Sequence, residues 1–494
     1  MDDLGRRTAR NGIVTITSQA LKFSVSMVAT VILARLLTPE DYGLIGMVGV
    51  ITGFISIFKD LGLASATIQK SDLNDRQIST LFWINVAFSL GTLVITAALA
   101  PLVARFYSEP RLLLITVAYS VGFLLGGVAV QHEALLKRRM RFLAIASVEL
   151  VSLLVGIVIA VSLAWRGFRY WALIISQLCQ SLVYAIGVWT ACRWIPSLPS
   201  RHSGVRSMLA FGRNLTGFSV VNYFARNLDN LLIGRFWGSQ QLGLYARAYQ
   251  LLMLPLEQIN TPIVSVAMPA LSRLIDDPER YRAAYLRLLE KIALLTMPLM
   301  AFMIVTSDWL VLMLLGPKWS GVTPIFALLG IAGLFQPILS TGGVLYLTQA
   351  RSHHMFQWGL IASSIIVATF FIGLPWGAIG VAMAYSAAFP LVLTPLAFWF
   401  IGREGPVRAR DLYSTSAPFL IASVVSLLAA LAFRRWFAIT VPIFGIVASA
   451  FVVLMTSLLV LMSTKRGRAA LLDGFDSIMM LVKRTPHKEV TIMP

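Results

Sequence analysis

Apolar runs of about 20 residues, separated by short polar stretches, recur along nearly all of this 494-residue chain. A helix of that length crosses a hydrocarbon core of roughly 30 Å and satisfies its own backbone hydrogen bonds. With 57% hydrophobic and 13% charged residues, the chain is not a soluble globule. We therefore predict an all-α integral membrane protein. The fourteen expected spans are 12–34, 43–62, 79–103, 112–134, 143–164, 170–191, 210–234, 242–268, 291–315, 322–348, 356–374, 377–401, 415–433 and 439–462.

The Lys and Arg residues are distributed unevenly between the two sides of the membrane. The side that holds the N-terminus has 28 of them, the other side has 9, and four lie within spans or at their inner ends. By the positive-inside rule, both termini are expected to be cytoplasmic. The net charge of +19 then serves orientation and contact with anionic membrane lipids, as in the cluster "KRRMR" at 137–141. Nucleic acid is not an expected partner.

The segment "ARLLTPEDYGLIGM" at 34–47 predicts an elbow between the first two spans. Thr38 suits the N-cap of the second helix, Pro39 its first position, and Asp41 the third position of a capping box. Tyr42 suits the membrane interface.

The elbow recurs in weaker form as "GRFWGSQQLGLYAR" at 234–247. At a shift of 200 residues, the identical pairs are Arg35 and Arg235, Gly43 and Gly243, and Leu44 and Leu244. Upstream, "ARNGI" at 9–13 is matched by "GRNLT" at 212–216, so the first and seventh helices are predicted to be equivalent. Six spans separate them, which gives both repeats the same orientation, about an axis along the membrane normal.

This repeat predicts two pseudo-symmetric six-helix lobes around a central cleft, followed by a C-terminal helix pair. The expected limits are an N-lobe at 1–191, a cytoplasmic linker at 192–209, a C-lobe at 210–401, helices thirteen and fourteen at 402–464, and a cytoplasmic amphipathic tail at 465–494. The mixed-charge connection at 272–291 is expected to form a cytoplasmic surface helix that begins near Pro278.

Two matched polar stripes are expected to face the cleft. Residues at spacings of three and four share a helix face, and charges at that depth turn toward water or a partner. The stripe on the first helix is Thr15, Ser18, Lys22 and Ser26, and that on the seventh is Ser219, Asn222, Arg226 and Asp229. The eighth helix adds Arg247, Gln250 and Glu257, with bends expected at Pro255, Pro262 and Pro269.

The cations of these stripes, Lys22, Arg226 and Arg247, predict an anionic substrate such as a phosphate or an acidic sugar. Asp229 and Glu257 are candidates for coupling to H⁺ or Na⁺. Structural alternatives to these site assignments stay open. Arg226 and Asp229 could form an i, i+3 ion pair that only stabilises the helix, Lys22 could extend its ammonium to the membrane interface (snorkelling), and Arg247 could reach the outer interface. The small-residue stripe Gly43, Gly46, Gly49 and Gly53 is interpreted as helix packing.

Several longer runs resemble a known family. They are "LLTPEDYGLIGM", "LGLASATIQKSDLNDRQISTLFWINV" at 61–86, "LDNLLIGRFWGSQQLGLYARAYQL" at 228–251, "LLGPKWSG" at 314–321 and "GAIGVAMAYS" at 377–386. As a set they resemble the bacterial polysaccharide transporters, the Wzx-type flippases of the multidrug/oligosaccharidyl-lipid/polysaccharide (MOP) exporter superfamily, nearest the colanic acid and teichuronic acid branch.

The resemblance implies a MATE/MOP-like fold and transfer of an undecaprenyl-pyrophosphate-linked oligosaccharide across the inner membrane by alternating access. It further implies that the pyrophosphate is held by cleft cations, which here would be Arg226 with Lys22 and Arg247 beside it. Exopolysaccharide, O-antigen or capsule assembly would be the setting, and the polysaccharide polymerase machinery is a candidate partner.

Other classes lack their sequence signals. The chain has no G-x-x-x-x-G-K-[ST] run for an ATP-driven exporter, and its short outer connections do not suit a glycosyltransferase, so we expect a secondary transporter that is not an enzyme. His353 and His354 lack an obvious acidic partner, and neither a metal nor a cofactor is expected. A small-molecule antiporter of the same superfamily is the main alternative, and a structural scaffold ranks third.

Overall fold

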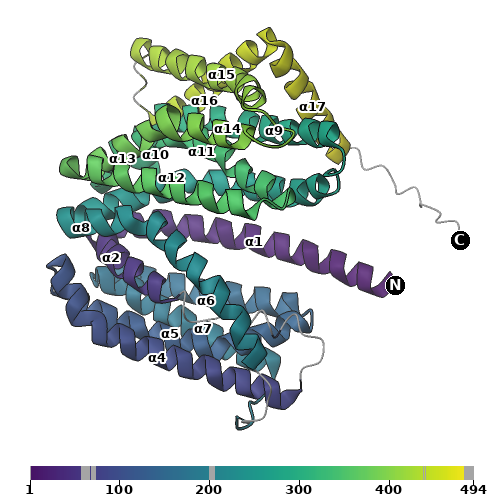
Figure 1. Cartoon of the computed structure of the whole chain (residues 1–494). Coiled ribbons are helices and arrows are strands. Elements are labelled where there is room, and N and C mark those ends of the chain that lie inside the picture. The colour runs from purple at the N-terminus through teal and green to yellow at the C-terminus, as the bar shows by residue number, and fades with distance from the viewer. Residues whose placement is uncertain are drawn as a thin grey trace, which may run out of the picture. The chain divides into compact units, whose positions relative to one another are not determined.

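All the regular structure in the described part of the chain is helical (Figure 1). The computed structural model describes residues 2–56, 67, 74–199, 206–437, 439 and 441–482. Within these residues, eleven segments are long and apolar enough to cross a membrane. Ser352–Gly402 holds two predicted spans, and Arg226–Ser272 holds one together with the end of the span before it, which α8 (Arg206–Ser272) covers in full. Helix α2 (Pro39–Ser56) covers most of another. Helices therefore lie over every predicted span, and the all-α membrane fold is confirmed.

The chain divides into two compact units, and the first comprises Met1–Ala246, Leu314–Gly321 and Leu374–Ala378. Besides α2, its elements are α1 (Asp2–Leu36), α4 (Asp75–Tyr107), α5 (Arg111–Arg138), α6 (Phe142–Trp165), α7 (Tyr170–Cys192), the first part of α8 (Arg206–Ser272), and the short 3₁₀ turns η1 (Pro317–Trp319) and η2 (Leu374–Trp376). Within it, α4 packs on α5, α5 on α7, α6 on α7, and α1 on α6. The limits predicted for the two lobes stay a prediction.

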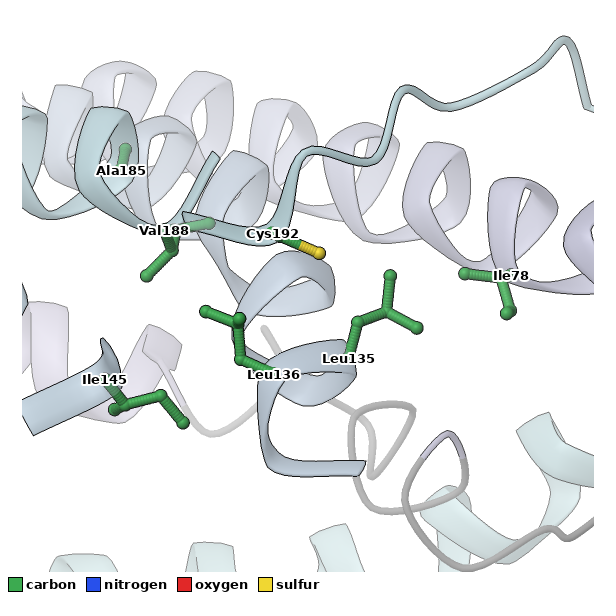
Figure 2. Packing of buried hydrophobic residues seen from close by; sticks show 8 residues of the cluster. Ile78, Leu135, Leu136, Ile145, Ala185, Val188 and Cys192 are labelled. Atoms are coloured by element: carbon green, nitrogen blue, oxygen red, sulfur yellow. The ribbon is translucent and has the colours of Figure 1, made fainter. Parts of the chain in front are cut away.

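The core of the first unit includes a compact apolar cluster where α4, α5, α6 and α7 come together (Figure 2). Leu136 and Val188 are fully buried there, and Cys192, with Ile78 and Ile145, completes the contact. Burying apolar side chains between helices excludes lipid and water alike and relies on close packing. The cluster therefore fixes the four helices to one another at one end of the unit.

The second unit comprises Arg247–Met313, Val322–Gly373 and Ile379–Pro494. Besides the rest of α8, its elements are α9 (Pro278–Val305), α10 (Ser307–Leu314), α11 (Val322–Thr348), α12 (Ser352–Gly373), α13 (Gly377–Ala388), the π-helical turn η3 (Phe389–Leu393), α14 (Thr394–Gly402), α15 (Ala409–Trp436), α16 (Pro442–Ser463) and α17 (Lys465–Val482). In this unit α9 packs against α11, α15 and α16, so the terminal helix pair is part of its core.

Two glycines separate consecutive spans where the chain otherwise reads as one long helix. Gly238 interrupts α8 with φ +79°, and Gly377, the first residue of α13 directly after η2, has φ +71°. Side chains with a Cβ rarely adopt these φ values, so glycine is suited to both breaks. Gly238 divides spans 210–234 and 242–268, and Gly377 divides 356–374 and 377–401, as predicted. The backbone of α8 stays helical through its three prolines, so the bends expected there stay a prediction.

The prediction of a surface helix at 272–291 is correct for where the helix begins and wrong for its extent. A helix does begin at Pro278, where the Asp277 carboxylate caps it by accepting from the Arg280 N–H at 3.1 Å. It is not a separate surface helix, because α9 runs on without a break to Val305 and already buries Tyr281 in its first turn. The predicted tail helix exists as α17, whose Asp473 lies 3.2 Å from Lys291 of α9. Its placement on the membrane stays a prediction.

Candidate functional site

The two copies of the elbow pack directly on each other within the first unit. A Cβ added to Gly43 would lie 1.7 Å from the backbone oxygen of Ser239, and a Cβ added to Gly243 would lie 1.8 Å from that of Pro39. Pro39 and Ser239 are each four residues before their own glycine, so the contact is reciprocal at the 200-residue shift. The repeat therefore has a structural reason: the helices that begin at the two elbows cross where neither has a side chain.

The predicted capping of the first elbow is confirmed. The Thr38 hydroxyl accepts the Asp41 N–H at 3.3 Å, and the Asp41 carboxylate accepts the Thr38 N–H at 3.0 Å. Each elbow also takes part in a hydrogen bond from a tryptophan indole, as acceptor in the first copy and as donor in the second. The Trp319 N–H donates to the Ala34 carbonyl, and that of Trp237 donates to the Leu374 carbonyl, both at 2.7 Å.

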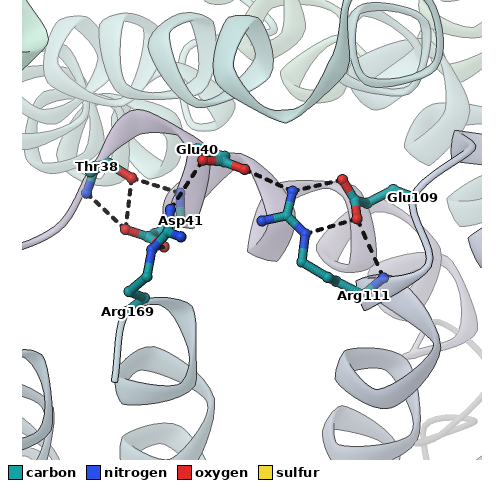
Figure 3. A network of polar contacts seen from close by, with 6 residues as sticks. All are labelled: Thr38, Glu40, Asp41, Glu109, Arg111 and Arg169. Carbon is teal, nitrogen blue, oxygen red and sulfur yellow. Dashed lines mark hydrogen bonds and ion pairs between the residues drawn. The ribbon is translucent and has the colours of Figure 1, made fainter. Parts of the chain in front are cut away.

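A network of charged side chains surrounds the first elbow (Figure 3). The Arg111 guanidinium contacts Glu40 and Glu109, each at 2.7 Å, and Arg169 contacts Glu40 at 3.1 Å and Asp41 at 3.4 Å. Hydrogen bonding to Arg111 is the main cause that holds the pKa of Glu40 and of Glu109 below their usual values. The network joins the start of α2 to the connections before α5 and α7. The pairings with Glu40 are long-range, and the sequence analysis did not find the network.

Lys22 has a partner that the sequence analysis missed. Its ammonium forms an ion pair with the Glu149 carboxylate of α6, and the two side chains are 19% and 33% exposed. Lys22 therefore does not need to reach the interface, which removes the reason for the snorkelling reading. Glu149 carried a usable signal, because a lone carboxylate inside an apolar span normally faces a partner or a cavity.

A second carboxylate lies close to this pair. The Tyr184 hydroxyl of α7 is hydrogen-bonded to Glu133 of α5 and is within range of the charge of Glu149, and Glu133 lies 2.6 Å from Lys137. Lys137 belongs to the basic cluster at 137–141. Charged and hydroxyl groups on α5, α7, α6 and α1 thus form a series from that cluster to Lys22 within the first unit.

Arg226 and Asp229 differ in environment. Arg226 is exposed, whereas Asp229 is only 6% exposed. The Asp229 carboxylate accepts from the Tyr245 hydroxyl at 3.0 Å and from the Asn230 N–H at 2.7 Å. In the described part of the chain no ion pair joins Asp229 to Arg226, which removes the support for the structural-pair reading. The hydrogen bond from Tyr245 links the two halves of α8 and was not foreseen.

The other predicted cleft residues are only partly brought together. In the second unit, the Arg247 guanidinium donates to the side-chain oxygen of Gln250 at 2.6 Å, and Glu257 is exposed. In the first unit, Ser18 is half-buried and Ser26 is exposed. The predictions for Thr15, Ser219 and Asn222 concern side chains that lie outside the described residues. The assignment of all these residues to a substrate site stays a prediction.

The structure uses three of the four glycines of the stripe on α2 for helix packing. Gly43 packs on Ser239, Gly46 on Leu242, and a Cβ on Gly53 would lie 2.3 Å from the Tyr223 hydroxyl, so helix packing is confirmed for these three. It is wrong for Gly49, around whose added Cβ no atom lies within 4 Å.

His354 does have an acidic neighbour, contrary to expectation, because its Nε2 lies 3.3 Å from a carboxylate oxygen of Glu404. Groups of three or more His, Cys, Asp or Glu residues that could hold a metal ion do not occur among the described residues.

The fold is shared with transporters of known structure. The lipid II flippase MurJ in an inward closed conformation superposes with a TM-score of 0.73 at 15% identity, over 92% of this chain and 98% of that one. An inward-facing multidrug resistance MATE family transporter of the MOP superfamily gives a TM-score of 0.59 at 13% identity, over 80% of this chain and 96% of that one. The chain therefore has the fold of the MOP transporters.

Sequence comparison shows which proteins of known role this chain resembles. The teichuronic acid biosynthesis protein TuaB of Bacillus subtilis is 27% identical over 62% of this chain. The match spans 64% of TuaB, which is slightly less than two thirds of its length. The lipopolysaccharide biosynthesis protein WzxC of Escherichia coli is 27% identical over 73% of this chain and 74% of its own. The succinoglycan biosynthesis transport protein ExoT of Rhizobium meliloti is 24% identical over 85% of this chain and 86% of its own.

The family described as "Polysaccharide biosynthesis protein" matches residues 32–324, more than half of the chain. The chain belongs to this family.

Proposed function

We propose that the protein is a flippase. It transfers an undecaprenyl-pyrophosphate-linked oligosaccharide from the cytoplasmic to the outer leaflet of the inner membrane by alternating access, for exopolysaccharide, O-antigen or capsule assembly. The observation that carries this proposal is the fold that the chain shares with the lipid II flippase MurJ over 92% of its length. Membership of a polysaccharide biosynthesis family supports an oligosaccharide as the cargo. On this proposal the protein is a secondary transporter and not an enzyme.

The pyrophosphate is proposed to be bound by Lys22, Arg226 and Arg247. Contacts between ammonium or guanidinium groups and phosphate oxygens are charge-assisted and stronger than neutral hydrogen bonds. Support for Lys22 comes from its partial exposure beside a carboxylate, in a span where an uncompensated charge costs several kcal/mol. Support for Arg226 comes from its exposed side chain.

Glu149 is proposed to pair with Lys22 whenever no pyrophosphate is bound. While the site is empty, its carboxylate neutralises Lys22 and keeps the span stable in the membrane. A pyrophosphate offers more charge and more acceptor oxygens than a single carboxylate, so it replaces Glu149 as the partner of Lys22. Release on the other side returns Lys22 to Glu149, and the site is reset.

Ion coupling is proposed to rest on Asp229. Its carboxylate is buried and hydrogen-bonded to Tyr245, whereas Glu257 is exposed. A change of protonation, or binding of Na⁺, alters a buried carboxylate far more than an exposed one. The polar side chains proposed to line the path of the substrate through the protein are Thr15, Ser18, Ser26, Ser219, Asn222 and Gln250.

We also propose that both termini are cytoplasmic and that residues 1–191 and 210–401 act as the two lobes. The excess of Lys and Arg on the proposed cytoplasmic side supports this topology. The Arg residues on the proposed outer side are few, and several of them form ion pairs with nearby carboxylates. Arg111 and Arg169 contact Glu40, and Arg434 contacts Asp308 at 2.7 Å, so three of these cations are neutralised locally. Membrane lipids and the polysaccharide polymerase machinery are the proposed partners.

Deleting the gene in the bacterium that encodes it tests the function. The expected result is loss of one surface polysaccharide together with accumulation of undecaprenyl-pyrophosphate-linked repeat units in extracted lipids, both restored by the wild-type gene. A small-molecule antiporter is the second candidate, favoured by the likeness to the MATE transporter. Normal polysaccharide in the deletion strain, with raised sensitivity to cationic drugs, would replace the flippase proposal by that candidate.

A further inference from the structure

A cavity of about 380 Å³ lies among α2, α5 and α7 in the first unit. Its volume falls within the range of roughly 300–1,000 Å³ that is usual for small-molecule pockets. The residues that line it, all of them described, include no Lys, Arg, Asp, Glu or His. The cavity is therefore chemically distinct from the cationic site proposed for the pyrophosphate.

Glycines on two helices keep this space open. Gly49 and Gly53 lie four residues apart on α2, and Gly122 and Gly126 lie four apart on α5, so each pair shares one helix face toward the cavity. A Cβ on Gly49 would meet no atom within 4 Å, and one on Gly122 would meet only the Leu178 side chain, at 3.8 Å. The space at Gly49 and Gly122 is thus not used for helix packing, in contrast to Gly43 and to Gly53, whose added Cβ would meet the Tyr223 hydroxyl.

The lining offers neutral hydrogen-bonding groups in complementary sets. Thr52 donates its hydroxyl hydrogen to the Val48 carbonyl at 2.9 Å, and Ser56 donates to the Gly53 carbonyl at 2.6 Å, so their oxygens remain as acceptors. The Gln177 side-chain oxygen accepts from Tyr119, which leaves the two amide hydrogens of Gln177 as donors.

The remaining lining is apolar and aromatic. Phe123 and the Tyr119 ring come from α5, and Ile174 and Leu178 from α7. Apolar walls with a few placed polar groups are typical of pockets that orient a small ligand. A phosphate group would lose its hydration here without gaining a cation, which is costly. A sugar ring has apolar C–H faces and hydroxyl groups that both donate and accept, and it fits both parts of this lining.

We propose that this cavity, the glycan pocket, binds an uncharged sugar residue of the lipid-linked oligosaccharide while the cationic site holds the pyrophosphate. The inference rests on the proposed function for the identity of the cargo. It adds a second binding site, in the first unit alone, that selects the glycan. A lipid without a sugar would leave the pocket empty and gain nothing from it.

Filling the pocket without disturbing the fold tests this proposal. Gly49→Leu places a side chain in open space, and Gly91→Leu is the matched control, because an added Cβ at Gly91 on α4 also meets no atom within 4 Å and Gly91 does not line the cavity. Thr52→Val, which removes one acceptor, is a second variant with little change in shape. Proteoliposomes would be loaded with undecaprenyl pyrophosphate that carries one glucose, or with the sugar-free lipid, and transfer of each would be measured.

Transfer of the glucosylated lipid is expected to fall about ten-fold or more in Gly49→Leu and several-fold in Thr52→Val, with little change in Gly91→Leu or for the sugar-free lipid. Equal loss for both lipids, or no loss for either, would overturn the glycan pocket. If the wild type transfers neither lipid, the flippase proposal fails for these lipids, and saturation-transfer NMR with methyl β-glucoside decides on the pocket: signal lost in Gly49→Leu alone supports it, and equal signal in all variants rejects it.

Discussion

Gly43 and Gly243 lie face to face where the two elbows cross, and an added Cβ on Gly243 would come within 3.1 Å of the Gly43 backbone nitrogen. Small residues at such a crossing let two membrane helices approach through their backbones, which is the main way such helices gain packing energy without a hydrophobic driving force. The contact joins the predicted equivalents of two repeats, and it is the most direct structural evidence that the repeat is real.

Alanine at Gly43 or Gly243 is therefore expected to destabilise the protein. The added methyl group meets backbone atoms that cannot move aside, and overpacking of this kind costs about 1–3 kcal/mol or more. Gly49→Ala is the control on the same helix, where the methyl group enters open space and alanine favours the helix. Thermal unfolding in detergent measures the difference, and an equal melting temperature for Gly43→Ala and Gly49→Ala would contradict the crossing.

Removing the charge of Glu149 is expected to tighten the binding of undecaprenyl pyrophosphate. In Glu149→Gln, Lys22 keeps its charge but loses its resident partner, so the lipid no longer competes with a carboxylate. We expect a Kd about ten-fold lower, or about 1.4 kcal/mol, with slower transfer because release is harder. Binding in nanodiscs measures this, with Glu133→Gln as the control on the neighbouring carboxylate. Weaker binding by Glu149→Gln would show that Glu149 supports the site instead of occupying it.

The network around Arg111 is expected to stabilise the protein in a pH-dependent way. Because the pKa values of Glu40 and Glu109 are lower in the folded state, their contribution is fully present above the usual carboxyl value of about 4.3 and is lost as the pH falls through the folded-state values. Arg111→Gln should therefore lower the Tm at pH 7 and have a smaller effect near pH 3. For exposed pairs the expected size is about 1 kcal/mol or less each.

Arg105→Gln provides the control for this pH series, because Arg105 is an exposed cation at the end of α4 that is outside the network. It should leave the Tm nearly unchanged at both pH values. A loss in Arg111→Gln that is as large at pH 3 as at pH 7 would mean that the packing of the side chain, and not its charge, is what matters.

Asp229→Asn is expected to remove the dependence of transfer on an ion gradient. Asparagine keeps the shape and can still accept from Tyr245, so the fold should survive, but it can neither change its charge nor attract Na⁺ strongly. Transfer in the presence and absence of H⁺ and Na⁺ gradients measures this, and Glu257→Gln is the exposed control. Gradient dependence retained in Asp229→Asn but lost in Glu257→Gln would reverse the assignment.

Much of the fold follows from local sequence signals. The spans were predicted from apolar length, the start of α2 from Thr38 and Asp41, and the repeat from pairs such as Gly43 and Gly243. These features depend on residues close in sequence or on a simple periodic shift. The continuous helix α9 was missed because its charged first turns and its apolar remainder look like two elements, although Pro278 marks only one start.

The candidate site was harder to predict because its contacts are long-range. Lys22 and Glu149 are 127 residues apart, and nothing near either of them specifies the other. The same holds for the glycan pocket: Gly49 has the spacing of a packing residue, and only the positions of α5 and α7 show that its face is open. Sequence periodicity gives the face of a helix but not what that face meets.

The most direct test of the central claim is the transfer of a fluorescent undecaprenyl-pyrophosphate oligosaccharide across proteoliposome membranes without nucleotide. Wild type and Arg105→Ala are predicted to transfer it, whereas Lys22→Ala and Arg226→Ala, reconstituted in equal amounts, should be slower by about ten-fold or more, as expected for loss of a charge-assisted contact. Transfer that is unchanged in both variants would contradict the assignment of the cations. No transfer by the wild type, with export of small cations or drugs instead, would contradict the flippase itself.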